Sequence, residues 1–323
     1  MAGATIFEVL KGSSRRAFGV KINQLHLDFI KHGASFMPEM KIFIIFLRVL
    51  LFNLSLIFND KSMNTQTNTG GTKSNLKISL LQMDIVWGDP KANALTAQKA
   101  IDANPGSDLY VLPEMWSTGF ATEPKDIAEK DLRSLNWMVH TARQKSVALA
   151  GSIATELADG DYRNRFYFVK PTGEVVYYDK HHLFTYGGED KRYTAGNHRT
   201  IVEYGGIKFL LLVCYDLRFP MWSRSHEDYD CILYVASWPT SRIDAWRTLL
   251  KARAIENQCY VAGVNRVGTD PACQYCGGTM LIDAYGKVVK ECDDNKEMVI
   301  TAEIDTTQLQ DFRKKFPVLK DRD

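Results

Sequence analysis

The stretch LLLVCYDLRFP, residues 210–220, starts as an unbroken apolar run and turns polar and aromatic at Cys214. Short apolar runs of this kind are typical of strands that are buried on both faces, as in the sheets of α/β proteins. Cys214 is therefore expected at the end of a buried strand. There it is either the last apolar side chain of that strand or a nucleophile that the strand holds in place.

Segments with strand character alternate with segments of helical spacing on both sides of this run. An Asp-Pro pair at residues 89–90 opens an alanine-rich helical pattern. The alternation predicts an α/β domain in which helices cover buried sheets. The predicted strands are residues 76–83, 108–114, 146–154, 164–170, 175–180, 207–216, 231–237, 259–267 and 279–286, and the predicted helices are residues 89–103, 124–144 and 242–258.

Composition and charge restrict the class of protein. The chain has 323 residues, of which 45% are apolar, so it can build a sizeable core. Its 40 basic and 38 acidic side chains give a formal charge of only +2, which argues against a nucleic-acid partner and favours a small ligand. The six cysteines are irregularly spaced, so free thiols and a cytoplasmic location are expected. They are Cys214, Cys231, Cys259, Cys273, Cys276 and Cys292.

The N-terminal part differs from the rest. Residues 42–58 are almost wholly apolar, but they are fewer than the roughly 20 residues that a membrane helix needs. No small-residue cleavage site follows them, as a signal peptide would require. A further possibility is that translation starts at Met63. We therefore expect residues 1–75 to be an N-terminal extension, which is a start-site error, an anchor or a disordered segment, and residues 76–323 to be the functional domain. A membrane is not the expected partner.

Residues whose side chains can take part in catalysis stand at the ends of three predicted strands: Glu114, Lys180 and Cys214. Taken singly, the first two are read as solvated charges and the third as a small buried hydrophobe. Together they supply what a thiol nucleophile needs, because a cysteine of ordinary pKa is mostly protonated at neutral pH. Glu114 can act as the base and Lys180 as the nearby cation.

This combination suits hydrolysis of a carbon–nitrogen bond. Glu114 would accept the thiol proton while Cys214 attacks the carbonyl carbon, and Lys180 with the backbone N–H of Tyr215 would stabilise the oxyanion. The same carboxyl group would then protonate the departing ammonia and activate the water that cleaves the thioester. Neither a metal nor an organic cofactor is required.

The motifs around these residues resemble those of the nitrilase superfamily of carbon–nitrogen hydrolases. LPEMWSTGF is similar to the family segment with the catalytic Glu114, YYDKHHLF to the segment with Lys180, and VCYDLRFP to the segment with Cys214. The resemblance implies a four-layer α-β-β-α sandwich that forms homodimers. It also implies a second glutamate near the lysine, for which Glu189 is the candidate and Asp190 the less favoured choice.

Within the superfamily the motifs look most like the omega-amidase branch, which hydrolyses the terminal amide of 2-oxoglutaramate or 2-oxosuccinamate. Such substrates carry a carboxylate, so the pocket should contain a cation. We expect Arg242 in this role and Trp238 as a pocket wall. Arg218 is expected to be structural, paired with Asp216 or Glu256. Another aliphatic amidase, a carbamoyl amidase or a nitrilase would use the same catalytic residues.

Several other interpretations compete with this one. A cysteine–histidine hydrolase would use His181 or His182 as the base. The CQYC sequence, residues 273–276, has the spacing of a redox pair or half a zinc site, but no second pair follows at a suitable distance. The remaining alternatives are a membrane-anchored acyltransferase of the same superfamily and a binding protein that has lost its activity.

Overall fold

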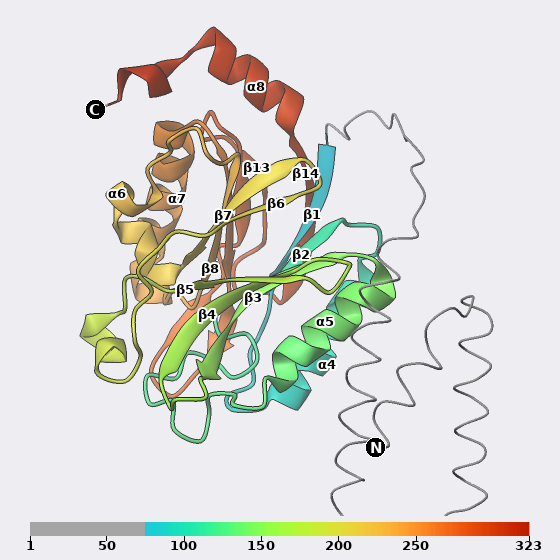
Figure 1. Ribbon diagram of the computed structural model, residues 1–323, viewed down its shortest axis with the longest axis vertical. Coiled ribbons are helices and arrows are strands. Elements are labelled where there is room, and N and C mark those ends of the chain that lie inside the picture. Colours follow the sequence, from blue (N-terminus) through green and yellow to red (C-terminus); the bar gives the residue numbers. More distant parts are fainter. Residues whose placement is uncertain (1–74, 323) are drawn as a thin grey trace, which may run out of the picture. The chain divides into compact units, whose positions relative to one another are not determined.

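The computed structural model describes residues 75–322, which contain two six-stranded sheets (Figure 1). The first sheet has the order β14-β1-β2-β3-β4-β5 and the second the order β13-β12-β9-β8-β7-β6. The strands of the first are β1 (Asn75–Gln82), β2 (Leu109–Val111), β3 (Ala148–Glu156), β4 (Tyr162–Val169), β5 (Val175–Asp179) and β14 (Met298–Asp305). Those of the second are β6 (Ile201–Tyr204), β7 (Ile207–Val213), β8 (Cys231–Ala236), β9 (Tyr260–Asn265), β12 (Met280–Ile282) and β13 (Val288–Glu291).

Each sheet has a parallel centre and antiparallel flanks. Strands β1, β2 and β3 run parallel in the first sheet, and β7, β8 and β9 run parallel in the second. Parallel neighbours end at the same edge of a sheet, so the loops after them open side by side. A separate hairpin of β10 (Val267–Thr269) and β11 (Gln274–Cys276) follows β9.

Helices cover the outer face of each sheet. On the first sheet lie α4 (Pro90–Ala103) and α5 (Arg133–Lys145), whose buried residues Ala97, Ile101, Met138 and Ala142 belong to one apolar cluster with Leu81 of β1. On the second lies α7 (Ile243–Asn257), with the short α6 (Pro220–Ser223) beside it, and α8 (Thr306–Lys315) follows β14 (Figure 1). The predicted four-layer α-β-β-α sandwich is confirmed.

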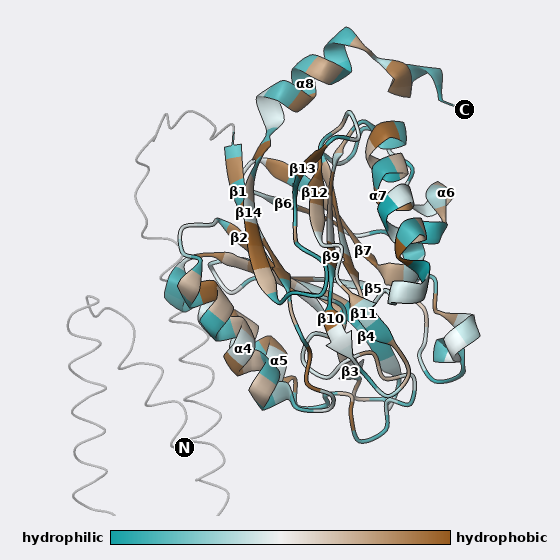
Figure 2. Cartoon of the chain, turned by 180° about the vertical axis from the view of Figure 1, so that it is seen from behind, coloured by the Kyte–Doolittle hydropathy of each residue, from teal (hydrophilic) through white to brown (hydrophobic). Residues whose placement is uncertain are grey.

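The main core lies between the two sheets. Phe168 of β4 and Phe209 of β7 meet across this layer with their ring centroids 6.0 Å apart. Along β1, Leu76, Ile78 and Leu80 belong to this core, as expected when alternate side chains face opposite sides of a strand. Figure 2 shows the strands as predominantly brown between helices that carry many teal residues.

Most predicted elements differ from the structure in their bounds, and two of these differences are explained by buried carboxylates. The helix expected over residues 124–144 begins only at Arg133, because the buried Glu129 carboxylate accepts the backbone N–H and the hydroxyl of Ser134 and so caps the helix there. The strand expected over residues 207–216 ends at Val213. Cys214 starts a 3₁₀ turn, residues 214–218, in place of continuing the strand.

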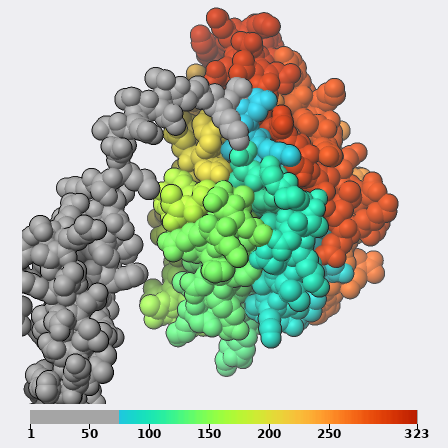
Figure 3. All heavy atoms as spheres, turned by 90° about the vertical axis from the view of Figure 1, so that its right-hand side faces the viewer, coloured from blue at the N-terminus to red at the C-terminus, as the bar shows by residue number. Residues whose placement is uncertain are grey.

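The first and last strands of the described chain lie next to each other. Asn75–Gln82 pairs antiparallel with Met298–Asp305, and Figure 3 shows the blue and red segments side by side. The predicted extension, apart from Asn75, falls outside the described residues, as do the apolar run 42–58 and the possible start at Met63. No helix within residues 75–322 has the length and apolarity needed to cross a membrane.

Candidate active site

Cys214 stands at the carboxyl end of β7 in a backbone conformation that few residues other than glycine adopt. Its φ is 44°, in the left-handed region. A residue of this kind costs free energy and persists only where the surrounding structure enforces it, which is common at functional sites. The turn that follows brings Tyr215 to the wall of the same pocket that the cysteine lines.

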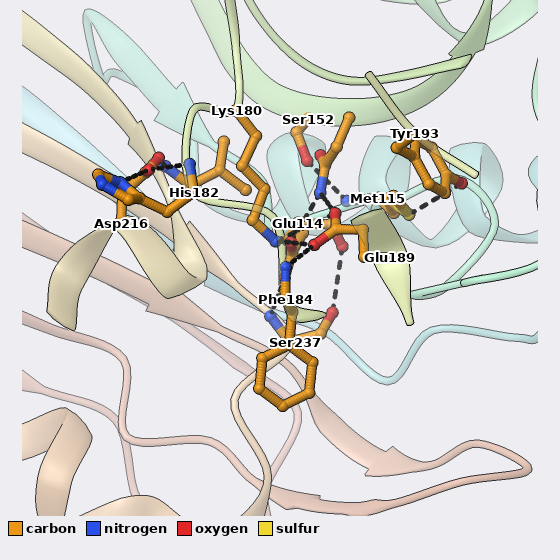
Figure 4. Close-up of polar contacts among 12 residues, drawn as sticks. Glu114, Met115, Ser152, Lys180, His182, Phe184, Glu189, Tyr193, Asp216 and Ser237 are labelled. Atoms are coloured by element: carbon orange, nitrogen blue, oxygen red, sulfur yellow. Dashed lines mark hydrogen bonds and ion pairs between the residues drawn. The ribbon is translucent and has the colours of Figure 1, made fainter. Parts of the chain in front are cut away.

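Lys180 lies directly after β5 and is enclosed by two carboxylates (Figure 4). Its Nζ is 2.9 Å from Oε1 of Glu114, and 2.8 and 3.2 Å from the two carboxylate oxygens of Glu189. All three side chains are fully buried. A buried charge is tolerated only when it is paired, so one ammonium group between two carboxylates forms an interdependent cluster.

Backbone and amide donors hold the two carboxylates in place (Figure 4). The backbone N–H of Ser237, at the end of β8, donates to Oε2 of Glu114 at 2.8 Å, and this bond joins the two sheets. The side-chain amide of Asn164 donates to Glu114 at 2.8 Å and to Glu189 at 3.0 Å. The backbone N–H of Phe184 donates to Glu189 at 2.6 Å.

The electrostatics of this cluster keep the lysine charged and the cysteine protonated. Burial alone would lower the pKa of Lys180, but the carboxylates of Glu114 and Glu189 more than offset it and raise that pKa above its ordinary value. Burial raises the pKa of Glu189, and the nearby charge of Glu114 raises it further. Burial and Glu114 likewise raise the pKa of the Cys214 thiol far above its usual range, although Lys180 opposes them.

Comparisons with known proteins give the family. The profile of the family described as carbon-nitrogen hydrolase matches residues 77–314. The chain belongs to this family. It is 46% identical over 251 residues to omega-amidase YafV of Escherichia coli (strain K12), a match that covers 77% of this chain and 97% of the relative.

Two further relatives of this carbon–nitrogen hydrolase are informative. A 2-oxoglutaramate amidase of Bacillus subtilis (strain 168) is 38% identical over 251 residues, which cover 76% of this chain and 96% of that protein. The crystal structure of XC1258 from Xanthomonas campestris, a CN-hydrolase superfamily protein with an arsenic adduct in its active site, matches with a TM-score of 0.75. It is 40% identical, and the match covers 77% of this chain and 97% of that one.

A cavity of about 500 Å³ opens over Cys214 in this carbon–nitrogen hydrolase. Its walls are largely apolar and aromatic. The predicted wall residue Trp238 lines it and is almost fully buried, with its backbone N–H donating to the side chain of Asn265. The predicted cation Arg242 also lines it, with its guanidinium 5.5 Å from the ring centroid of Phe184. The cavity therefore combines apolar walls with a positive charge.

The ion pair expected between Arg218 and Asp216 or Glu256 does not form. Asp216 bonds to Tyr178, His182 and Val213, and Glu256 pairs with Arg253, so neither expected partner contacts Arg218. The 3₁₀ turn directs the exposed Arg218 to the pocket wall, where its guanidinium lies 5.0 Å from the ring centroid of Trp238. The pocket therefore has a second guanidinium that the sequence did not reveal.

The histidines that competed with Glu114 for the role of base point elsewhere. The Nδ1 atom of His182 is 2.8 Å from Asp216, and the ring stacks on Phe219 with centroids 3.8 Å apart. The Nδ1 atom of His181 is 2.6 Å from the carbonyl of Gly196, and this ring stacks on Trp222 at 3.7 Å. Neither histidine is among the residues that line the cavity.

The CQYC sequence does not form a site of its own. Cys273 lines the cavity, whereas Cys276 is buried at the end of β11. All six cysteines are free thiols. Within residues 75–322 no group of three or more histidine, cysteine, aspartate or glutamate side chains could hold a metal ion.

Two residues of the site were missed from the sequence. Ser237 ends the apolar run of β8 as Cys214 ends that of β7, so the same strand-end argument applied to residues 231–237 would have found it. Asn164 lies within β4 and contacts the site through its side-chain amide and through its backbone carbonyl, which accepts the N–H of Lys180 at 3.0 Å. Only the pairing of β4 with β3 and β5 brings that amide to the carboxylates, and this pairing has no local sequence signal.

Proposed function

We propose that this chain is an omega-amidase, which hydrolyses the terminal amide of a small 2-oxo acid such as 2-oxoglutaramate and releases ammonia. Two observations support the proposal: the buried Glu114–Lys180 pair beside a strand-end thiol, and the relatives whose names are omega-amidase and 2-oxoglutaramate amidase. The buried ion pair matters most, because it provides a proton acceptor and a fixed positive charge next to a thiol that is protonated at rest.

In the first half of the reaction a thioester forms. Cys214 attacks the amide carbon while its proton passes to Glu114. Because the proton leaves during the attack, no preformed thiolate is needed. The negative charge that develops on the amide oxygen is stabilised by Lys180 and by the backbone N–H of Tyr215. The carbon–nitrogen bond then breaks, and the leaving nitrogen takes the proton from Glu114 to depart as ammonia.

In the second half water cleaves the thioester. Glu114, now ionised again, accepts a proton from the water as its oxygen attacks the acyl carbon. The carbon–sulfur bond breaks, the product acid leaves and the proton returns to the sulfur of Cys214. Glu189 and Asn164 act as positioning residues, because both hold the Glu114–Lys180 pair in the geometry that these transfers require.

The substrate carboxylate is received by Arg218 and Arg242. Both arginines line the cavity of Cys214, and their guanidinium groups lie 5.0 and 5.5 Å from the ring centroids of Trp238 and Phe184. A guanidinium binds a carboxylate with paired, charge-assisted hydrogen bonds, and an apolar wall strengthens them. Trp238 forms that wall.

A substrate panel tests the proposal. Ammonia release is measured with 2-oxoglutaramate, glutamine, butyramide and a short aliphatic nitrile. An omega-amidase has its highest kcat/KM for 2-oxoglutaramate, since glutamine places an ammonium group beside the two arginines and butyramide has no carboxylate. A higher kcat/KM for butyramide or the nitrile would assign the chain to another activity of the same family.

We propose further that residues 76–323 form the catalytic domain and that it works as a cytoplasmic homodimer. The family profile spans nearly the same residues, the free thiols suit a reducing compartment, and Met221 and Ile255 leave exposed apolar surface on α6 and α7. Light scattering on the purified protein tests the assembly, and a monomeric mass would contradict it.

A further inference from the structure

The segment after Lys180 and the segment after Cys214 are joined by one buried carboxylate, that of Asp216 (Figure 4). Its Oδ1 accepts the backbone N–H of His182 at 2.9 Å and the Nδ1–H of the same residue at 2.8 Å. Its Oδ2 accepts the hydroxyl of Tyr178 at 2.9 Å and the backbone N–H of Val213 at 3.0 Å. Four donors therefore converge on a side chain with no exposed surface.

Other contacts strengthen the same junction. The Tyr178 hydroxyl, besides donating to Asp216, accepts the indole N–H of Trp222 at 3.0 Å and the backbone N–H of His181 at 3.1 Å. The two histidine rings stack face to face on Phe219 and Trp222, with interplanar angles of 6° and 9°. Residues 180–182 (KHH) and residues 214–222 (CYDLRFPMW) therefore pack against each other as one unit.

We propose that Asp216 and His182 form a positioning pair that sets the Cys214 sulfur at its working distance from Lys180 and Glu114. The inference deepens the proposed function and rests on it, because it takes these three residues as the reacting groups. Neither member of the pair touches the substrate. Their effect on the reaction passes through the backbone on either side of Cys214 and Lys180.

The backbone of Cys214 explains why such a pair is needed. A left-handed φ of 44° is unfavourable for a cysteine. If the turn lost its contacts, the φ angle of Cys214 would therefore relax toward the usual negative values. Asp216 ties the N–H of Val213, just before the strained residue, to the chain just after Lys180. Loss of this tie moves the sulfur relative to its base and its cation, and misplacement by about 1 Å costs roughly 100-fold in rate.

The primary test is Asp216→Asn in the full-length chain. Asparagine keeps the shape but replaces one acceptor oxygen with a donor that faces other donors. We expect kcat to fall by about 100-fold both for 2-oxoglutaramate and for butyramide, which has no carboxylate for Arg218 to bind, because the displaced group is the Cys214 sulfur. Unchanged kcat in the folded Asp216→Asn protein would overturn the inference.

Matched variants separate positioning from general destabilisation. Asp230 also accepts a backbone N–H, from Lys208, and a cationic side chain, Arg313, but it lies at the opposite end of the second sheet. Asp230→Asn should lower the melting temperature and leave kcat unchanged. Comparable losses of kcat in both aspartate variants would mean that stability alone is affected, and would also overturn the inference.

Two substitutions of His182 give a second and independent readout. Asparagine at this position places an amide N–H near the site of Nδ1 and restores the donor to Asp216, whereas phenylalanine keeps the stacked ring and removes the donor. His182→Asn should keep kcat within about tenfold of the wild type, and His182→Phe, which keeps the backbone N–H to Asp216 but loses the ring donor, should fall between His182→Asn and Asp216→Asn. The reverse order would contradict the pairing.

The proposed function is tested separately with Cys214→Ala. If that variant releases ammonia at the wild-type rate, the assignment of the nucleophile fails whatever Asp216 does. If it is inactive while Asp216→Asn and His182→Phe keep wild-type kcat, the assignment stands and only the positioning pair fails.

Discussion

At the scale of single residues, the site is organised around the charge of Lys180. Its ammonium group neutralises the charge of one of the two carboxylates that contact it. Because the groups are buried, removing the ammonium from the carboxylates would cost a large free energy. The cluster explains how a thiol whose pKa is raised can still react. The base is already in place, so the proton has to move only when the carbon–sulfur bond forms.

The pH dependence of alkylation tests this state of the thiol. Iodoacetamide reacts with the thiolate, and the pKa of Cys214 lies well above its usual value because of burial and Glu114. The alkylation rate should therefore keep rising as the pH increases through 9, the ordinary thiol value. A plateau reached near pH 7 would indicate a thiolate already paired with Lys180, contrary to this account.

Substitution of the pocket arginines tests the carboxylate site. A lost hydrogen bond to a charged group costs about 1.5–3 kcal/mol, so Arg218→Gln or Arg242→Gln should each lower kcat/KM for 2-oxoglutaramate by roughly 10- to 100-fold. Butyramide, which has no carboxylate, is the control substrate and should be hydrolysed at an unchanged rate. Equal losses on both substrates would assign the arginines a structural role.

Glu114, Lys180 and Cys214 could be singled out from the sequence because each stands at the end of a predicted strand. Arg218 could not, since the side to which it points depends on the 3₁₀ turn that starts at Cys214. Asn164 was also beyond reach, because its position in the site follows from strand pairing and no local pattern indicates it.

At the scale of elements, the site is assembled by strand ends from both sheets. Glu114 and Lys180 follow β2 and β5 of the first sheet, while Cys214 and Ser237 follow β7 and β8 of the second. The order of the central strands and of the helices α4, α5 and α7 was predictable from apolar runs and helix start signals, whereas β6, β13, β14, α6 and α8 were not predicted. The exact ends of β7 and α5 were not predictable, because a buried carboxylate, Asp216 or Glu129, decides where each element stops or starts.

The close approach of Gly196 to the end of β5 is the contact between elements that is easiest to test. A Cβ atom at this position would lie 2.1 Å from the backbone oxygen of Asp179, and its own N–H bonds to the carbonyl of Lys180. Gly196→Ala should therefore push the end of β5 away, lowering the free energy of unfolding by about 1–3 kcal/mol and reducing kcat together with it. Denaturant unfolding and ammonia release measure the two effects, and a variant unchanged in both would show that this close approach is dispensable.

At the scale of the whole molecule, the sandwich brings the two halves of the site together. The Ser237 N–H to Glu114 bond crosses from one sheet to the other, so the sheets must pack correctly before the base is held. The four-layer arrangement followed from the family resemblance, whereas alternation of elements alone gave only an α/β domain. The packing of one sheet on the other cannot be predicted from the sequence pattern of a single strand.

Removal of the N-terminal extension tests the proposed domain boundary. An alignment of 251 residues covers 97% of the Escherichia coli relative, and the family profile matches residues 77–314. A chain that starts at Met63 should therefore keep kcat/KM for 2-oxoglutaramate within about twofold and the same melting temperature, since the family profile begins only at residue 77. A large loss of activity on truncation would place a functional element in the extension.

The central claim is that Cys214 breaks the amide bond with the help of the Glu114–Lys180 pair. Its most direct test is ammonia release from 2-oxoglutaramate by the wild type, Cys214→Ala and Cys273→Ala, the last removing the other thiol of the same cavity. The account predicts steady release by the wild type, most of that rate in Cys273→Ala and none in Cys214→Ala. Sustained release by Cys214→Ala would contradict it.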